Sequence, residues 1–339
     1  MRTRLTELLG VEHPVMLAGM GGVSYAPLVT AVSAAGGFGC LGASTMGPDR
    51  MVAEIAAVRR STDRPFGVDL LTAFPGDLVH QVELLVEGGA SVFVAGLGVP
   101  SAVIDLCHRH GVLVANMCGK VDHARRAVDA GCDLVVAQGT EAGGHTGQVA
   151  TLPLVPQVVD AVGDRVPVVA AGGIFDGRGL AAALALGAVG VWVGTRFIAT
   201  PEARGVTAYK EALLAAGEDG TTVSRAYSGK PMRVVRNDYT GYFDTHPEEL
   251  RSFPDQLRRS VDEGTLHLGA DGAVPVDPAR ECFPAGQGVG AIEDLVPAGE
   301  LVRRFVADAA AALDRLAGTG AQPAAVVTGQ ATPVPSSPQ

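Results

Sequence analysis

The length and composition of the chain favour a large buried core. Its 339 residues are 47% hydrophobic and 18% charged, which suits one large domain with an insertion or two smaller domains. The net charge is −10 and the 26 Lys and Arg residues are scattered, so no basic stripe exists to neutralise a phosphate backbone. We therefore expect no nucleic-acid partner.

The cysteines and the amino terminus indicate a cytoplasmic protein. Five cysteines, an odd number at wide spacing, fit a reducing compartment better than a disulfide scaffold. Glu12, His13 and Pro14 interrupt the first apolar segment before it reaches the length of an export signal. No apolar run approaches the roughly 20 residues of a membrane span, so we expect no membrane partner.

Eight short apolar blocks recur along the first two hundred residues. Each is rich in β-branched residues, alternates little, and ends in Gly, Ala or a polar residue, which is typical of a strand covered on both faces. The blocks are "PVMLAGM" from Pro14, "FGCLGA" from Phe38, "FGVDLL" from Phe66, "SVFVAGLG" from Ser91, "VLVANM" from Val112, "DLVVAQG" from Asp133, "PVVAAGG" from Pro167 and "VGVWVGT" from Val189.

Ala-rich segments with helical spacing lie between most of these blocks, and a glycine usually closes them. Examples are "APLVTAVSAAGG", "MVAEIAAVRR", "DLVHQVELLVEGG", "DHARRAVDAG" and "GRGLAAALALG". The alternation predicts an α/β fold of the TIM (β/α)₈ barrel type. A doubly wound open sheet is the competing architecture, but it predicts fewer strands and one phosphate loop near the first strand.

The character of the chain changes after the eighth strand. Residues 205–277 are polar and aromatic, with four of the five tyrosines, and we interpret them as a small, mostly helical second domain that forms a lid or substrate domain. "FPAGQGVGAIEDL" then returns to glycines, and "AGELVRRFVADAAAALDRLAG" predicts an amphipathic helix. The barrel would comprise residues 1–204 and 278–317, followed by a disordered tail over 318–339.

Two glycine loops follow the seventh and eighth predicted strands, and in a barrel such loops form the active site. Gly172 and Gly173 can expose backbone N–H groups just ahead of a helix, and Gly194 and Thr195 do the same one strand later. Glycines can also serve only to allow tight turns. Two adjacent loops aimed at one place favour a phosphate cup.

One histidine stands in an unusual setting. The stretch "DLVVAQGTEAGGHTG" places His145 among Gly143, Gly144 and Gly147, which offer no side chain to its ring nitrogens. Either the histidine only caps a turn, or something outside the chain occupies the space beside it.

Other chemical signals are weaker. His108 and His110, in "CHRH", lack a second ligand pair at zinc spacing, so we predict helix-end residues and no metal site. His123 lies among helix charges and should be on the surface. "GQGVG" lacks the βαβ context and the later acidic residue of a dinucleotide-binding fingerprint, so it is weak evidence for NAD.

Three segments together carry a family resemblance. "HPVMLAGMGGVSYAPLVTAVSAAGGFGCLGA", "AQGTEAGGHTG" and "VPVVAAGGIFDGRGLAAALALGAVGVWVGTRFIAT" resemble the nitronate monooxygenase family, formerly called 2-nitropropane dioxygenases. That family also includes flavin-dependent enoyl-acyl-carrier-protein reductases, and the similarity covers about residues 10 to 310. The resemblance implies a barrel that binds FMN without a covalent bond.

The resemblance also implies site residues. His145 would lie above the flavin and act as a base or as a hydrogen-bond donor, tasks that suit a group titrating near neutrality. The residues implied to bind the cofactor are Met20, Gly21, Asp69, Lys120, Gln138, Gly143, Gly144, Gly172, Gly173, Gly194, Thr195, Gln287 and Gly288.

Two positions depart from the family pattern. Asp69 stands where many members have Asn, and Gly19 stands where nitronate-oxidising members often have Pro. An ionised Asp only accepts hydrogen bonds. If Asp69 faces the flavin, its charge would disfavour the anionic reduced ring unless Lys120 compensates.

We expect an FMN-dependent oxidoreductase that oxidises alkyl nitronates to carbonyl compounds, with a small-molecule substrate and molecular oxygen as partners. The first alternative is an NAD(P)H-dependent flavin reductase or dehydrogenase acting on an acyl thioester of CoA or acyl-carrier protein. The second is a flavin-binding barrel without turnover. A homodimer is compatible with all three.

Overall fold

The computed structural model describes residues 1–72, 77–96, 98, 100–267 and 274–318. The tail expected over 318–339 lies outside these residues except for Gly318, where the last helix ends.

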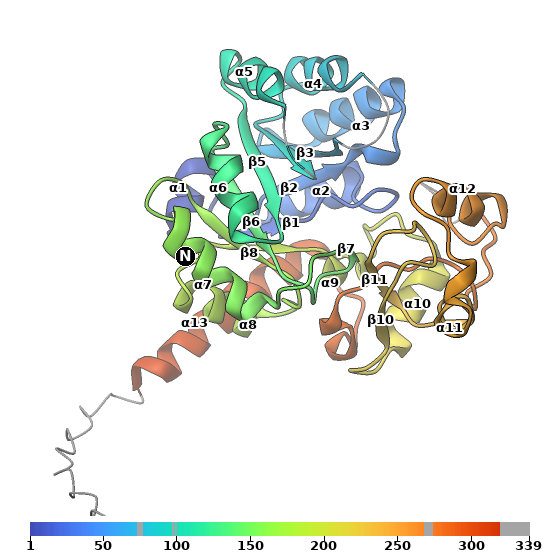
Figure 1. The fold of residues 1–339 in the computed structure, drawn as a ribbon. Helices are drawn as coiled ribbons and strands as arrows, with labels where there is room; N and C mark the ends of the chain where they lie inside the picture. Colours follow the sequence, from blue (N-terminus) through green and yellow to red (C-terminus); the bar gives the residue numbers. More distant parts are fainter. Residues whose placement is uncertain (73–76, 97, 99, 268–273, 319–339) are drawn as a thin grey trace, which may run out of the picture.

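Eight parallel strands form the central sheet, and all eight predicted blocks contribute one (Figure 1). The sheet order is β1-β9-β8-β6-β5-β4-β3-β2. Met16 in β1 forms an isolated parallel bridge with Phe38, just before β2, which brings the two edges together as a barrel. The strands are β1 (Val15–Leu17), β2 (Gly39–Gly42), β3 (Phe66–Leu71), β4 (Val92–Gly96), β5 (Leu113–Cys118), β6 (Leu134–Gln138), β8 (Val168–Ala171) and β9 (Val191–Val193).

The strands alternate little in sequence because both of their faces are buried. Val92, Val94 and Val136 belong to a cluster inside the barrel, whereas Phe93 and Val135 belong to the larger cluster between strands and helices. Helix α1 (Arg4–Leu9) adds Leu5 and Leu9 to the interior cluster, so it covers the amino-terminal end of the barrel. The opposite end, where the strands finish, is left for the site.

Helices surround the barrel. They are α2 (Ala26–Ala34), α3 (Pro48–Ser61), α4 (Leu78–Glu87), α5 (Ser101–Arg109), α6 (Val121–Asp129), α7 (Thr151–Val162), α8 (Gly177–Ala185), α9 (Thr195–Ile198) and α13 (Ala298–Gly318), with the 3₁₀ turns η1 (Ala43–Thr45) and η3 (Gln287–Ala291).

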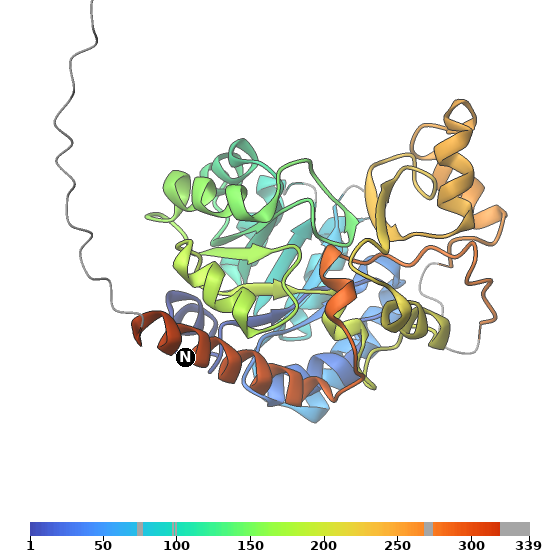
Figure 2. The same ribbon diagram turned by 90° about the horizontal axis from the view of Figure 1, so that it is seen from below.

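The last helix, α13, runs along one side of the barrel against α8 and α2 (Figure 2). The contact with α8 is close at Gly177, where a Cβ atom would lie 2.2 Å from the carbonyl oxygen of Phe305. The amphipathic helix expected at this place in the sequence is therefore present, and its buried face includes Leu301 and Phe305.

The segment that we interpreted as a second domain, and for which we keep that name, lies beside the carboxyl ends of the strands (Figure 1). Between residues 205 and 277 it contains α10 (Thr207–Ala215), α11 (Asp238–Thr245), η2 (Pro247–Glu249) and α12 (Asp255–Asp262). It also contains two strands that we did not predict, β10 (Thr221–Ser224) and β11 (Met232–Val235). These form a three-stranded antiparallel sheet with β7 (Gly144–His145), which belongs to the histidine loop of the barrel.

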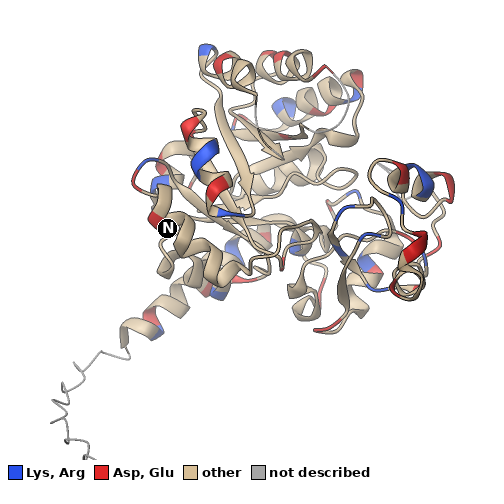
Figure 3. Ribbon diagram, viewed as in Figure 1, with Lys and Arg blue, Asp and Glu red and all other residues tan. Residues whose placement is uncertain are grey.

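Charged residues lie mainly on the outer helices and on the second domain, while the strands of the barrel contain few of them (Figure 3). All five cysteines are buried free thiols. In the part of the chain that the structure describes, no helix is both long and apolar enough to cross a membrane.

Candidate active site

A cavity of about 1000 Å³ opens where the barrel strands end and continues into the second domain. All but one of the residues expected around the cofactor line it, and so does His145. The exception is Gln287, whose side chain is exposed and whose backbone N–H donates to the carbonyl oxygen of Glu141 at 2.8 Å. The adjacent Gly288 does line the cavity.

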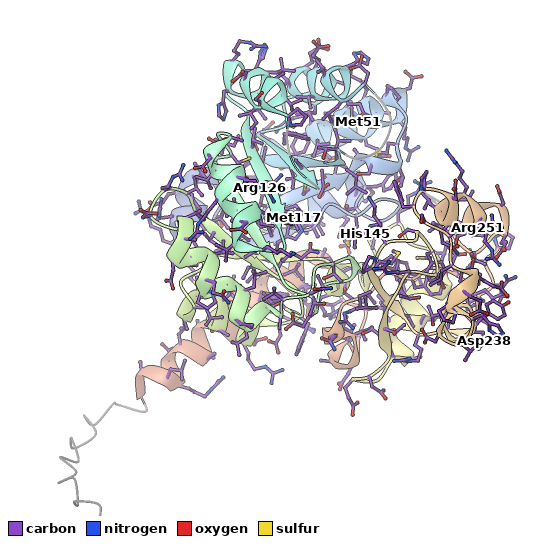
Figure 4. All side chains as sticks on the ribbon, viewed as in Figure 1. Met51, Met117, Arg126, His145, Asp238 and Arg251 are labelled. Carbon is purple, nitrogen blue, oxygen red and sulfur yellow. The ribbon has the colours of Figure 1, made fainter. Side chains whose placement is uncertain are left out.

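The glycine-rich histidine loop is held by the second domain. Gly144 has a φ of 75°, a conformation that a residue with a side chain rarely adopts, and it delivers the chain into β7. There His145 pairs with Met232 of β11, and Gly144 pairs with Arg233. Gln138 at the end of β6 donates through Nε2 to the carbonyl oxygen of His145 at 2.9 Å. His145 thus lies where the barrel meets the second domain (Figure 4).

The imidazole of His145 has one side-chain partner, Ser228, whose Oγ lies 3.0 Å from Nε2. The hydroxyl of Ser228 donates to the carbonyl oxygen of Lys230 at 3.2 Å, so Nε2 of His145 is the donor toward Oγ and Nδ1 keeps its lone pair. Burial lowers the pKa of His145, and the charge of Lys230 lowers it further. The ring is therefore neutral at pH 7 and able to accept a proton.

The two predicted glycine loops meet in the cavity. Gly172 and Gly173 have φ values of 106° and 70°, so the backbone turns in a way that needs glycine. The N–H groups of Gly173 and Thr195 have no acceptor among the described residues. Two free donors on adjacent loops can bind an anion such as a phosphate.

Comparison with known proteins decides the family. The family model described as nitronate monooxygenase matches residues 2–78 and 74–308. The chain belongs to the nitronate monooxygenase family. It is an oxidoreductase, and its cofactor is FMN, as in the flavoenzymes of this family.

Proteins with different names are similar to this chain. A Mycobacterium tuberculosis protein named (3aS,4S,5R,7aS)-5-hydroxy-7a-methyl-1-oxo-octahydro-1H-indene-4-carboxyl-CoA dehydrogenase is 44% identical over 77% of this chain and 73% of its own. FabK from Thermotoga maritima superposes with a TM-score of 0.85 at 34% identity, over 94% of this chain and 99% of that one. Nitroalkane oxidase from Streptomyces ansochromogenes superposes with a TM-score of 0.78 at 31% identity, over 92% and 99%.

The residues of this nitronate monooxygenase family member fit FMN. The free N–H groups of Gly173 and Thr195 suit its phosphate. Gly194 leaves room beside them, because a Cβ atom there would be no closer than 3.4 Å to its nearest neighbour, Sδ of Met20. Lys120 and Gln138 line the remainder of the cavity with polar atoms. When bound, FMN supplies a two-electron acceptor.

Asp69 and Gly19, the two departures from the family pattern, are in contact. A Cβ atom on Gly19 would lie 2.1 Å from Cβ of Asp69, so this arrangement requires glycine at position 19. Burial raises the pKa of Asp69 to about 8. Most of the carboxyl groups are therefore protonated at pH 7, and the negative charge that we considered from the sequence is present mainly above pH 8.

Sequence reasoning missed several polar residues of the site, among them Asn116 and Ser228. Asn116 in β5 is 3% exposed and lines the cavity, but it is one polar residue inside an apolar strand. Ser228 contacts His145 from 83 residues away, and no spacing pattern in the polar second domain could have indicated it. No group of three or more His, Cys, Asp and Glu side chains suited to a metal ion occurs within the described ranges.

Proposed function

We propose that this enzyme oxidises the acyl chain of a CoA thioester. The main support for the proposal is the volume of the cavity and its extension into the second domain. At about 1000 Å³ it stands at the upper end of the range typical of ligand sites. It extends from the glycine loops of the barrel to Leu257, Leu266 and Val276 of the second domain. A nitronate of a few heavy atoms beside FMN leaves this apolar extension without a function, whereas a long or cyclic acyl group would fill it.

The similarity to a carboxyl-CoA dehydrogenase at 44% identity supports the same reaction class. The sequence alone favoured nitronate oxidation and gave a reductase or dehydrogenase acting on an acyl thioester as the first alternative. We now favour that alternative. The oxidative direction follows the name of that relative.

His145 would perform the proton transfer. The hydrogen on the carbon next to a thioester carbonyl is weakly acidic, and its removal needs a neutral base in a site protected from water. In the proposed reaction the α-proton passes to Nδ1 of His145, and the hydrogen of the β-carbon leaves with its electron pair, which FMN, the two-electron acceptor of the site, would take up when bound. A carbon–carbon double bond forms in the acyl chain.

The decisive experiment is anaerobic mixing of the FMN-loaded enzyme with saturated acyl-CoA thioesters, including alicyclic ones, while the flavin absorbance is followed. We expect bleaching with a thioester and none with the corresponding free acid. His145→Ala should slow bleaching by ~10²–10⁴-fold, the usual contribution of a general base. Absence of bleaching with every saturated thioester tested would overturn the proposal.

Nitronate oxidation is the second candidate, favoured by the family model and by the similarity to nitroalkane oxidase. A nitronate is already an anion and needs no base, so His145→Ala should reduce its oxidation much less than it reduces thioester oxidation. Rapid bleaching by ethylnitronate, with formation of the carbonyl product in air and no response to any thioester, would favour this candidate.

A further inference from the structure

A second histidine lines the cavity, on the side formed by the second domain. His267 makes two hydrogen bonds to one carboxylate, that of Glu281: its backbone N–H donates to Oε1 at 3.1 Å, and its Nδ1 lies 2.7 Å from Oε2. Both residues line the same cavity as His145. The mechanism derived above uses neither of them.

The position of Glu281 is fixed by burial and by hydrogen bonds, so its carboxylate can orient the ring of His267. The residue is 4% exposed, and His267 supplies the only hydrogen bonds to its carboxylate among the described residues. Its backbone is fixed as well, because its carbonyl oxygen accepts from the Tyr227 hydroxyl at 3.1 Å and from the Asn237 amide at 2.8 Å. The neighbouring Cys282 N–H donates to the carbonyl oxygen of Thr265 at 2.9 Å, which ties the two segments together.

The free edge of the imidazole is its Nε2 atom. With Nδ1–H donating to the carboxylate, the neutral ring has its lone pair on Nε2, which has no partner in the described part of the chain. The side chain of His267 is 30% exposed, and the residue lines the cavity. Leu257, Leu266 and Val276, which also line the cavity on the side of the second domain, are apolar.

We propose that His267, oriented by Glu281, recognises a hydroxyl group on the apolar acyl portion of the substrate. A hydroxyl can donate to the lone pair of Nε2, whereas a ketone oxygen cannot. The inference rests on the proposed function, since it names the acyl group that the thioester carries. His267 acts here as a specificity-determining residue, and the proton transfer at the α-carbon remains with His145.

The test compares three CoA thioesters that share one ring skeleton and differ only in bearing a hydroxyl, a ketone or no oxygen. We expect the native enzyme to prefer the hydroxylated thioester in kcat/KM by about 10-fold or more, the range of one buried hydrogen bond. His267→Phe keeps a planar ring but should abolish this preference, with the oxygen-free thioester oxidised within about twofold of the native rate. His108→Phe is the matched control, because His108 pairs with Asp133 at 2.9 Å outside the cavity lining.

Glu281→Gln tests the orientation of the ring without removing it. The Gln carbonyl can accept from the His267 backbone, and its amide would donate to Nδ1, so Nε2 would become a donor. We expect the preference to move from the hydroxyl toward the ketone. This reversal is a change that a merely structural role of Glu281 would not produce, and FMN content and melting temperature report whether each variant is folded.

The outcomes separate the two proposals. If no thioester reduces the flavin of the native enzyme, the proposed function fails and this inference fails with it. Suppose instead that the native enzyme oxidises all three thioesters with equal kcat/KM, or that His267→Phe still prefers the hydroxylated thioester. In either case only the assignment of His267 is wrong.

Discussion

Lys230 contributes to the lowered pKa of His145 without touching the ring. The backbone N–H and carbonyl of Lys230 both bond to Oγ of Ser228, which in turn contacts the imidazole. Its ammonium charge disfavours the imidazolium form and so lowers the pKa of His145, in addition to the larger effect of burial. The backbone of Lys230 therefore helps to position Ser228, and its charge adds to the effect of burial on the pKa of His145.

Replacing Lys230 by Met should raise the pKa of His145, because the positive charge is lost. The rate of a reaction that needs neutral His145 falls as the pH drops through that pKa. The acidic limb of the pH profile of kcat/KM should therefore move to higher pH in Lys230→Met and stay in place in Lys230→Arg. Identical limbs in the native enzyme and in Lys230→Met would contradict this account.

Asp69 is the second residue whose charge depends on its burial. With a pKa of about 8, its carboxyl is neutral at pH 6.5 and ionised at pH 9. Asp69→Asn should leave the midpoint potential of the flavin nearly unchanged at pH 6.5 and raise it at pH 9, because an anion near the flavin disfavours the negatively charged reduced form. A unit charge in a partly dry site is worth about 4 kcal/mol at most at a separation of 4 Å. Redox titration at both pH values is the measurement.

Stability gives an independent check on Asp69. The pKa of Asp69 is raised on folding, from 3.8 to about 8, so between these pH values the folded state holds a proton that the unfolded state has released. The free energy of unfolding should therefore fall as the pH rises from 4 to 8, and Asp69→Asn should be less sensitive to pH over this window. Equal pH sensitivity in urea unfolding of the two proteins would show that the carboxyl is ionised throughout.

At the scale of elements, the pairing of β7 with β11 joins the histidine loop to the second domain. Arg233 reinforces it from a position that is 7% exposed. Its Nε donates to the carbonyl oxygen of Thr140 at 2.9 Å, and its guanidinium also donates to Oγ1 of Thr221 at 3.3 Å. One side chain thus holds together the loop after β6 and both strands of the second domain.

Arg233→Met should loosen this connection, at a cost of about 1–3 kcal/mol from the acceptors left without a donor. Because His145 lies on the affected strand, we expect kcat for the acyl substrate to fall about tenfold, in keeping with the sensitivity of catalysis to small misplacements. FMN content should be measured as well, because Gly143 and Gly144 of the same loop line the cavity. Arg236→Met, an exposed residue directly after β11, is the control. Equal kcat in the two variants would mean that the hydrogen bonds of Arg233 are not needed to position the histidine loop.

The helices and strands also show which parts of the fold can be predicted from the sequence. All eight barrel strands were predictable because burial on both faces produces short runs of β-branched residues. Helix α7 is not among the helical segments that we quoted from the sequence, and Pro153 and Pro156 lie within it. Strands β10 and β11, "TTVS" and "MRVV", were missed because a short mixed strand in a polar region resembles the loops around it.

At the scale of the molecule, the sequence indicated which loops carry the site but not what the second domain adds to it. Gly172, Gly173 and His145 could be selected because their chain neighbours made them unusual. Ser228, His267 and Glu281 can be recognised as site residues only from their contacts in the structure. Ser228 lies 83 residues from His145 along the chain, and His267 lies 14 residues from Glu281. A side chain whose role depends on such a contact leaves no local pattern.

The phosphate cup can be tested through the stability of the whole chain. A ligand that binds only the folded state stabilises it by RT ln(1 + [L]/Kd), about 2.7 kcal/mol at 100 times Kd. Gly194 is a suitable site for a substitution, because its φ of −106° is open to any residue and a Cβ atom there meets Sδ of Met20 at an ordinary 3.4 Å. Gly173 is less suitable, since its φ of 70° would strain a side chain even without ligand.

Gly194→Ala should therefore melt like the native protein when both lack FMN, yet gain much less stability when FMN is added, because the new methyl group crowds the phosphate. Riboflavin, which has the same ring without the phosphate, should stabilise both proteins by a similar and smaller amount. Gly47→Ala is the matched control, since Gly47 lies outside the cavity lining and a Cβ atom there meets nothing within 4 Å. Thermal melts at a series of ligand concentrations give the apparent Kd in each case. If FMN stabilises Gly194→Ala as strongly as the native protein, the phosphate lies away from this loop, and the free N–H of Thr195 must bind another group.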